Sequence, residues 1–79
     1  ADVDIVENIV LKNDIKKLYS MIGEILTDRE REIIFLRYGL HNRKEVTQRE
    51  IASQLGISRS YVSRIEKKAL KKLRECFEQ

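Results

Sequence analysis

The sequence predicts an all-α fold, a small domain of four to five helices that ends in a helix-turn-helix without a wing. Three observations predict it. Two capping boxes, at 27–30 and 47–50, mark helix starts, because a threonine and a glutamate three residues apart satisfy each other's free backbone amides. A glycine follows each of these two helices, as is typical of a helix end. None of the 79 residues is proline, and no glycine-rich hairpin follows the last helix.

Residues 1–13 and 14–79 differ in their patterning. The apolar residues of 1–13 are spread too evenly for a narrow stripe, so this segment is predicted to be a leader helix or a tail, packed on the domain or on a neighbouring one. From residue 14 apolar side chains recur at helical spacing up to Leu26, and Gly23 is expected to end or bend this helix. We therefore expect residues 14–79 to form one domain.

The next helix begins at the first capping box. It is predicted to run from Thr27 to about Tyr38, and Gly39 closes it. Apolar residues occupy so much of this helix that few positions remain for a polar face, so we expect the helix to be buried on more than one side. The polar connection at 41–46 includes the only histidine, His41, which is expected to be a solvated loop residue and not a metal ligand.

Residues 47–73 contain the predicted helix-turn-helix. The apolar residues of its first helix stop at Gly56, and Ser58 is a good N-cap for the second helix. Small Ala52 suits a close crossing of the two helices, and Gly56 suits a short turn that needs a positive φ. The second helix carries an apolar stripe with steps of three, four and four: Val62, Ile65, Ala69 and Leu73. These four side chains are expected in the core.

Two expectations concern the later part of that helix. Its last apolar side chains are predicted to fold back against the helix at 15–26: Leu70, Leu73, Cys76 and Phe77. Glu66 has no basic residue three or four positions away in either direction, so no pair within the helix explains it. We expect Glu66 either to form a cross-helix ion pair, with Arg37 or Arg49, or to be simply exposed.

Basic residues concentrate on this last helix. Residues 1–28 hold three Lys or Arg against six Asp or Glu, whereas 29–79 hold thirteen against seven, so the net charges are −3 and +6. In a helix-turn-helix the second helix lies in the DNA major groove, and a basic face there predicts a polyanionic partner. The outward residues of this helix are Arg59, Ser60, Ser63, Arg64 and Lys67. The alternative is a plain helical hairpin with a solvated basic face.

Several classes of protein are not expected. No apolar run is long enough for a transmembrane helix, and nothing resembles a signal peptide. The single cysteine, Cys76, cannot form an internal disulfide, which fits a reducing cytoplasm. The chain has no nucleophile–base pair, no phosphate-binding glycine loop and no metal-ligand spacing, so we expect no enzyme, no cofactor and no metal. Ala1 in place of methionine predicts a piece of a longer protein.

Two segments carry a resemblance to a known family. Residues 26–40, LTDREREIIFLRYGL, and 47–74, TQREIASQLGISRSYVSRIEKKALKKLR, are similar to region 4, the C-terminal promoter-recognition domain of bacterial RNA polymerase sigma factors. The pairing of these helices is far more specific than a lone helix-turn-helix. The similarity is strongest to the sporulation-type factors of endospore formers, the sigma-K-like and sigma-E-like group. It implies a cytoplasmic transcription factor that binds the −35 promoter element as duplex DNA.

By position, the resemblance implies two sets of DNA contacts. Base contacts are expected from Arg59, Ser60, Ser63 and Arg64, and backbone contacts from Arg29, Arg37, Thr47, Gln48, Lys67 and Lys68. Housekeeping factors carry acidic and longer basic groups at the positions of Ser60 and Ser63, so their −35 consensus does not carry over. We assign most direct specificity to Arg59 and Arg64, because arginine can donate two parallel hydrogen bonds to guanine.

The resemblance also implies protein partners. One is the flap-tip helix of the polymerase β subunit, held in an apolar cleft lined by Leu18, Ile22, Phe35, Leu70 and Leu73. The alternative is that these side chains form a closed core. An anti-sigma protein or an activator could use the same surfaces or three lysines: Lys68, Lys71 and Lys72.

Two other functions compete with promoter recognition. The DNA-binding module of a helix-turn-helix response regulator or repressor would bind palindromes as a dimer. A purely protein-binding domain would make no DNA contact. The sequence shows no coiled-coil heptad and no separate dimer helix, so a monomer is expected.

Overall fold

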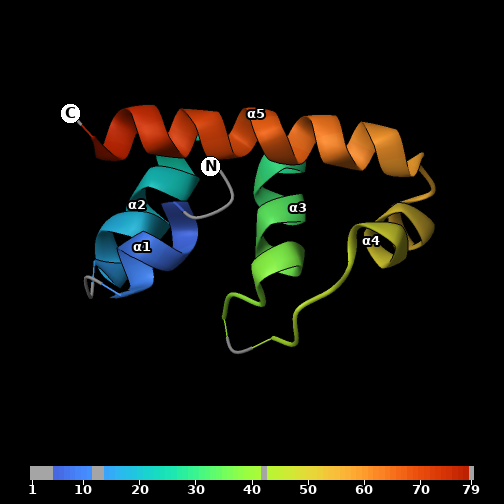
Figure 1. The fold of residues 1–79 in the computed structure, drawn as a ribbon, viewed down its shortest axis with the longest axis horizontal. Coiled ribbons are helices and arrows are strands. Elements are labelled where there is room, and N and C mark those ends of the chain that lie inside the picture. The colour runs from blue at the N-terminus through green and yellow to red at the C-terminus, as the bar shows by residue number, and fades with distance from the viewer. Residues whose placement is uncertain (1–4, 12–13, 42, 79) are drawn as a thin grey trace.

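The computed structural model describes residues 5–11, 14–41 and 43–78, and within them it contains five α-helices and no strand. The helices are α1 (Ile5–Leu11), α2 (Ile15–Ile25), α3 (Asp28–Tyr38), α4 (Gln48–Leu55) and α5 (Arg59–Phe77). Helix α5 runs along the molecule and contacts each of the other four helices. In Figure 1, α1 and α2 lie below its C-terminal half, α3 below its middle and α4 beside its N-terminal end. The predicted all-α fold with a helix-turn-helix is confirmed.

The helices start where the sequence predicted. Thr27 Oγ1 accepts a hydrogen bond from the Glu30 amide at 3.3 Å, and Glu30 Oε1 accepts one from the Thr27 amide at 2.9 Å. Thr47 and Glu50 form the same capping box at 3.1 and 3.4 Å. Ser58 Oγ accepts from the amide three residues later at 3.1 Å. Helices α3, α4 and α5 therefore each begin with a satisfied N-terminal amide.

Two glycines end helices in the left-handed conformation. Gly39 has φ 62° after α3, and Gly56 has φ 68° in the turn of the helix-turn-helix. A Cβ atom at Gly39 would also lie 2.5 Å from the Arg43 carbonyl oxygen, so that position lacks space as well as a permissive φ. Gly23 does not end α2, because the helix continues through it to Ile25. The expected helix end at Gly23 was therefore wrong, and a bend there stays a prediction.

Two apolar clusters make up the core, and α3 lies between them. The larger joins α1 and α2 to α3 and the C-terminal half of α5, and its fully or nearly fully buried members are Ile5, Val6, Ile9, Leu18, Met21, Ile22, Leu26, Ile34, Ala69, Leu70 and Leu73. The smaller joins the helix-turn-helix to α3 and contains Ile33, Ile51, Ala52 and Val62. Adjacent Ile33 and Ile34 enter different clusters because successive residues point about 100° apart around a helix. This confirms the predicted burial of α3 on more than one side.

The first helix is part of the larger cluster. Within the predicted leader at 1–13, Ile5, Val6 and Ile9 of α1 are at most 7% exposed. Residues 1–4 and 12–13 lie outside the described residues, and the domain boundary after residue 13 stays a prediction. At the other end of the chain, Cys76 and Phe77 pack against the same cluster, so the predicted fold-back of α5 is confirmed.

The buried stripe of α5 differs from the predicted one at one step. Its buried residues are Val62, Glu66, Ala69, Leu70 and Leu73. Ile65 is only partly buried, at the edge of the smaller cluster, so its placement in the core was wrong. Because α3 packs against the middle of α5, the face turned inward there includes Glu66.

Searched over the described residues, no helix is long and apolar enough to cross a membrane.

Candidate nucleic-acid interface

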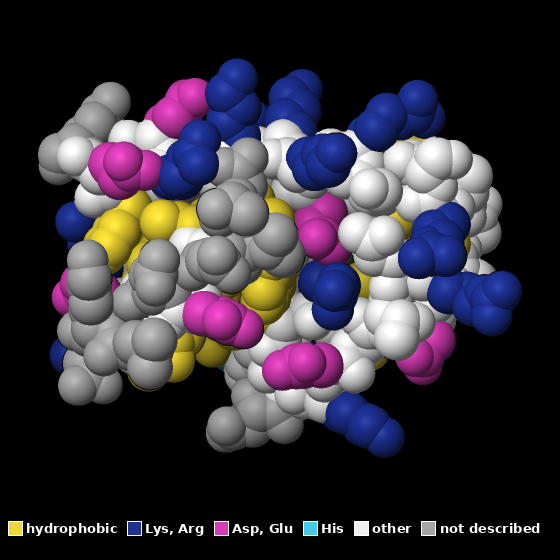
Figure 2. Space-filling view, viewed as in Figure 1, with side chains coloured by type: hydrophobic (Ala, Val, Ile, Leu, Met, Phe, Trp, Pro, Cys, Tyr) yellow, Lys and Arg dark blue, Asp and Glu magenta, His cyan; other side chains and the backbone are white. Residues whose placement is uncertain are grey.

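The four predicted base contacts lie on the first two turns of α5. Arg59, Ser60 and Arg64 are exposed, and Ser63 is half-buried. The helix starts at the Ser58 cap, directly after the Gly56 turn, and the contact of α4 with α5 fixes its direction. Figure 2 shows basic side chains along the α5 edge and around the end where α4 lies. Arg59 and Arg64 form no ion pair with another described residue, so both cations are available to a polyanion.

Three predicted DNA contacts meet in one pocket between the start of α3 and α5. This pocket has a volume of about 330 Å³, and its lining includes Arg29, Arg64 and Lys68 together with Tyr61. Arg29 is exposed and its Nη1 lies 3.4 Å from Glu32 on the same helix. Such an exposed pair contributes little stability, so its geometry does not hold Arg29 away from a ligand. Glu30 also lines this pocket but is paired with Lys72, so the three cations leave an excess of positive charge that favours an anionic partner.

Two further predicted backbone contacts meet at Glu66. This carboxylate is 5% exposed, and its Oε1 lies 3.2 Å from Arg37 Nε of α3. Gln48 Nε2 of α4 donates a hydrogen bond to the same oxygen at 3.2 Å. The Arg37 Nε atom is buried and makes no hydrogen bond within the described part of the chain, so its contact with Glu66 is an ion pair. The predicted cross-helix pair is confirmed, with Arg37 and not Arg49 as the partner, and simple exposure of Glu66 is excluded.

The remaining predicted backbone contacts are Thr47 and Lys67. The Thr47 hydroxyl is exposed and caps α4, accepting from the Glu50 amide and donating to Glu50 Oε1 at 3.0 Å. Lys67 is exposed on α5. The assignment of both residues to DNA contact stays a prediction.

A second cross-helix ion pair joins α3 to α5. Lys72 Nζ lies 2.8 Å from Glu30 Oε1, and the Glu30 side chain is 5% exposed. Burial by itself raises the pKa of Glu30. The hydrogen bond and charge of Lys72 and the hydrogen bonds of Thr27 outweigh this effect and hold the pKa below its ordinary value of 4.5. Lys72 is therefore part of the scaffold, which makes it unsuitable as a simple test of phosphate contact.

The Glu30–Lys72 pair should make stability depend on pH. Because the pKa of Glu30 is lowered on folding, its contribution is present above pH 4.5 and is lost as the pH falls through the folded-state pKa. We expect Lys72→Met to lower the urea-measured free energy of unfolding at pH 7, and the deficit to shrink as the pH falls from 5 to 3. Exposed Lys71→Met is the matched control. A deficit that stayed constant over this range would show that the ion pair does not account for it.

Four of the five predicted flap-binding residues are closed off from the surface. Leu18, Ile22, Leu70 and Leu73 are at most 2% exposed in the larger cluster, beneath the buried side chains of α1. Phe35 is partly buried at the edge of this cluster and also lines a pocket of about 460 Å³ between α3 and α4. In this structure the other four side chains form a closed core, the alternative considered above, so an apolar partner could reach them only if α1 left its position.

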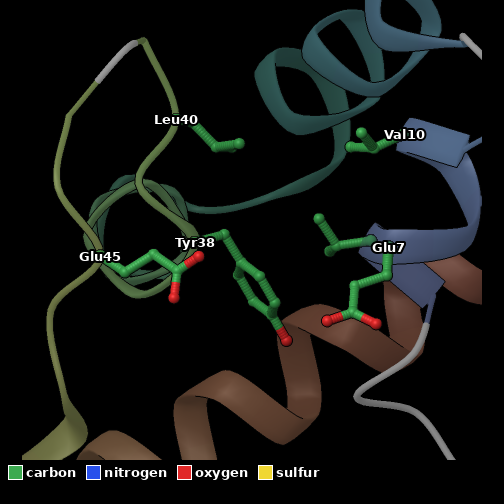
Figure 3. A pocket seen from close by; sticks show the side chains of 6 residues that line it. Glu7, Val10, Tyr38, Leu40 and Glu45 are labelled. Atoms are coloured by element: carbon green, nitrogen blue, oxygen red, sulfur yellow. The ribbon is translucent and has the colours of Figure 1, made fainter.

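A separate pocket of about 330 Å³ lies between α1 and the end of α3. Its lining residues are Val6, Glu7, Val10, Tyr38, Leu40 and Glu45. Figure 3 shows side chains from both sides converging on it, with the two carboxylates beside the Tyr38 ring. None of the predicted site residues lines it. His41, nearby in the chain, is exposed as expected but stacks on the Tyr19 ring at 4.7 Å, and its amide donates to the Tyr19 hydroxyl at 3.0 Å.

The sequence reasoning missed two features of this surface. Tyr61 is 45% exposed between the predicted base contacts, and its helical spacing to Arg64 could have indicated a pair. The Glu30–Lys72 pair joins residues 42 positions apart, for which the sequence carries no local signal.

The comparisons with known proteins all indicate the same family. The family described as "Sigma-70, region 4" matches residues 24–75. The chain is 56% identical over 70 residues to an RNA polymerase sigma-K factor of Bacillus subtilis, which covers 89% of this chain and 24% of the relative. It is 54% identical over 70 residues to a sigma-28 factor of Bacillus thuringiensis, covering 89% and 29%, and 43% identical over 75 residues to a sigma-E factor of Clostridium acetobutylicum, covering 95% and 32%. No solved structure gives a significant match.

Proposed function

Because the chain belongs to the sigma-70 region 4 family, we propose that it is the promoter-recognition domain of an RNA polymerase sigma factor. In this role the first turns of α5 lie in the major groove of the −35 element. The observation that carries the proposal is the pair of exposed, unneutralised arginines, Arg59 and Arg64, on a capped helix that follows a left-handed glycine turn.

Each residue predicted to contact DNA has a separate role in the proposed complex. Arg59 and Arg64 donate to guanine edges, and the short hydroxyls of Ser60 and Ser63 contact bases with less discrimination. Arg29, Lys67 and Lys68 contact phosphates from the exposed surface. Arg37 and Gln48 are half-buried and Thr47 is exposed, each already bound to a carboxylate, and these three side chains position the DNA backbone against the helix-turn-helix.

The partners are proposed from the relatives. The chain spans about a quarter to a third of the length of the sigma factors it matches, so it works as one part of a larger cytoplasmic factor that binds the RNA polymerase core. From the similarity to a sigma-K and a sigma-E factor, we also propose that this chain takes part in transcription initiation at sporulation genes. Docking on the polymerase β-flap through the larger cluster requires α1 to move aside, because α1 packs on that cluster.

Isolated, this surface should bind DNA weakly. One recognition helix is a single module that buries on the order of 600–1,000 Å², and a monomer has no second half-site to add affinity. Phosphate contacts make such binding strongly dependent on salt. Delivery by the polymerase supplies the missing affinity through a high effective concentration. We therefore expect micromolar or weaker binding by the chain alone.

The proposal is tested by selecting bound duplexes from a random library with the 79-residue chain fused to the polymerase flap. One asymmetric −35-like sequence is expected. Against that sequence, Arg64→Ala should cost about 1–3 kcal/mol and relax the preference at one base pair, whereas Lys68→Ala should weaken all sequences about equally. Failure to enrich any sequence would contradict the proposal. A palindrome bound by a dimer would indicate a repressor or response-regulator module instead.

A further inference from the structure

We propose that Tyr61 is a specificity-determining residue of this surface, because its ring orients the Arg64 guanidinium toward the base that Arg64 reads. Tyr61 acts as a positioning residue through Arg64. The inference rests on the proposed function and adds to it a side chain that neither the sequence reasoning nor the family likeness assigned to DNA recognition.

The geometry comes from the first two turns of α5. Arg64 Cζ lies 5.8 Å from the centre of the Tyr61 ring, within the range of a cation–π contact. The two side chains are three residues apart, which places them on one face of the helix. The Tyr61 amide donates to Ser58 Oγ at 3.1 Å, so the backbone that carries the ring is fixed by the N-cap. Tyr61 is 45% exposed and is therefore at the surface that would meet the DNA.

Among the groups around Arg64, the Tyr61 ring is the one that attracts its guanidinium. The pocket beside it is lined by two further cations, Arg29 and Lys68, which repel a guanidinium, and by the Glu30 carboxylate. Two acids on α3 and α5 are buried, and both already have a cation as partner: Glu30 is paired with Lys72 and Glu66 with Arg37. No described carboxylate forms an ion pair with Arg64. Without the ring, the long Arg64 side chain would have many rotamers and no partner to select among them.

The chemistry of a guanidinium makes this contact compatible with base reading. The N–H donors of arginine lie in the plane of the group, whereas a ring contact uses its face. Arg64 can therefore keep its contact with Tyr61 and still present two donors to guanine O6 and N7. An ion pair with a carboxylate would instead occupy those donors. The ring holds the side chain in place without competing with the base.

The test compares Tyr61→Phe and Tyr61→Leu, each with Arg64 present and with Arg64→Ala. Fluorescence anisotropy at low salt measures each chain on the selected −35 duplex and on a duplex changed only at the base pair read by Arg64. Circular dichroism melts show whether each variant is folded. We expect Tyr61→Leu to lower the affinity ratio of the two duplexes about two- to fivefold, as loss of an exposed cation–π contact implies. Tyr61→Phe should keep the ratio, because it keeps the ring.

The double substitution tests whether Tyr61 acts through Arg64. With Arg64→Ala, Tyr61→Leu should leave the ratio unchanged, since the side chain it orients is absent. If Tyr61→Leu kept the wild-type ratio, or weakened both duplexes equally, the inference would be overturned while the proposed function stood. If the wild-type chain did not discriminate between the duplexes, the proposed function would fail and the inference with it.

Discussion

Ile51→Ala is expected to lower the free energy of unfolding by about 2–5 kcal/mol, as for other fully buried isoleucines. Ile51 is 0% exposed and belongs to the small cluster that joins α4 to α3 and α5. That cluster has four buried members, so Ile51 is a large part of its fully buried apolar volume. A domain of this length has a total stability on the order of 4–12 kcal/mol, so the substitution removes a large fraction of it.

Urea unfolding followed by circular dichroism measures this loss, and Ile65→Ala is the matched control. Both substitutions remove the same atoms, but Ile65 is only partly buried at the edge of the same cluster, so about 1 kcal/mol is expected there. Equal losses for the two variants would mean that the cluster does not have the packing described here.

Glu66→Ala is expected to lower the free energy of unfolding by about 2–3 kcal/mol. Removing one member of a buried ion pair typically costs roughly 3–5 kcal/mol, because it leaves the other charge without a partner. Here the Arg37 side chain is 34% exposed and can recover part of its hydration, which reduces the expected loss. Gln48 would also lose its acceptor on α5. Glu66→Gln keeps the volume and one acceptor oxygen, so it should cost less than Glu66→Ala.

A double-mutant cycle separates the ion pair from packing. In an Arg37→Met background no cation remains to be left unpaired, so Glu66→Ala should cost clearly less than it does in the wild type. DNA binding adds a second measurement. Glu66 connects two predicted backbone contacts, and its loss should weaken binding to all duplexes without changing the preferred sequence. Strictly additive stability losses in the cycle would argue against a stabilising pair.

The features that could be predicted from the sequence depend on residues close together in the chain. A capping box needs two side chains three residues apart, and a helix end needs one residue that tolerates a positive φ, so 27–30, 47–50, Gly39 and Gly56 were all read correctly. The exposure of Arg59 and Arg64 followed from the same local pattern. These features can be predicted without knowing which helices contact one another.

The features that were missed depend on contacts between helices. A stripe with steps of three and four leaves the rotation of a helix uncertain by about one residue. In the structure Glu66 is buried and Ile65 lies partly buried at the edge of the smaller cluster, and Arg37 and Gln48 offer partners to the buried acid. The sequence pattern likewise could not distinguish an apolar cleft from a closed core, since both need the same residue types.

The nineteen residues of α5 have a mechanical consequence. The helix is about 28 Å long and contains neither glycine nor proline, so nothing inside it favours a kink. Its first turns carry the side chains assigned to DNA, and its last turns are clamped by α1 and α2. A tilt imposed on the clamped end is therefore transmitted as a tilt of the same size at the DNA end, some five turns away. A partner that binds at the C-terminal end of α5 could therefore change the orientation of Arg59 and Arg64 without contacting either residue.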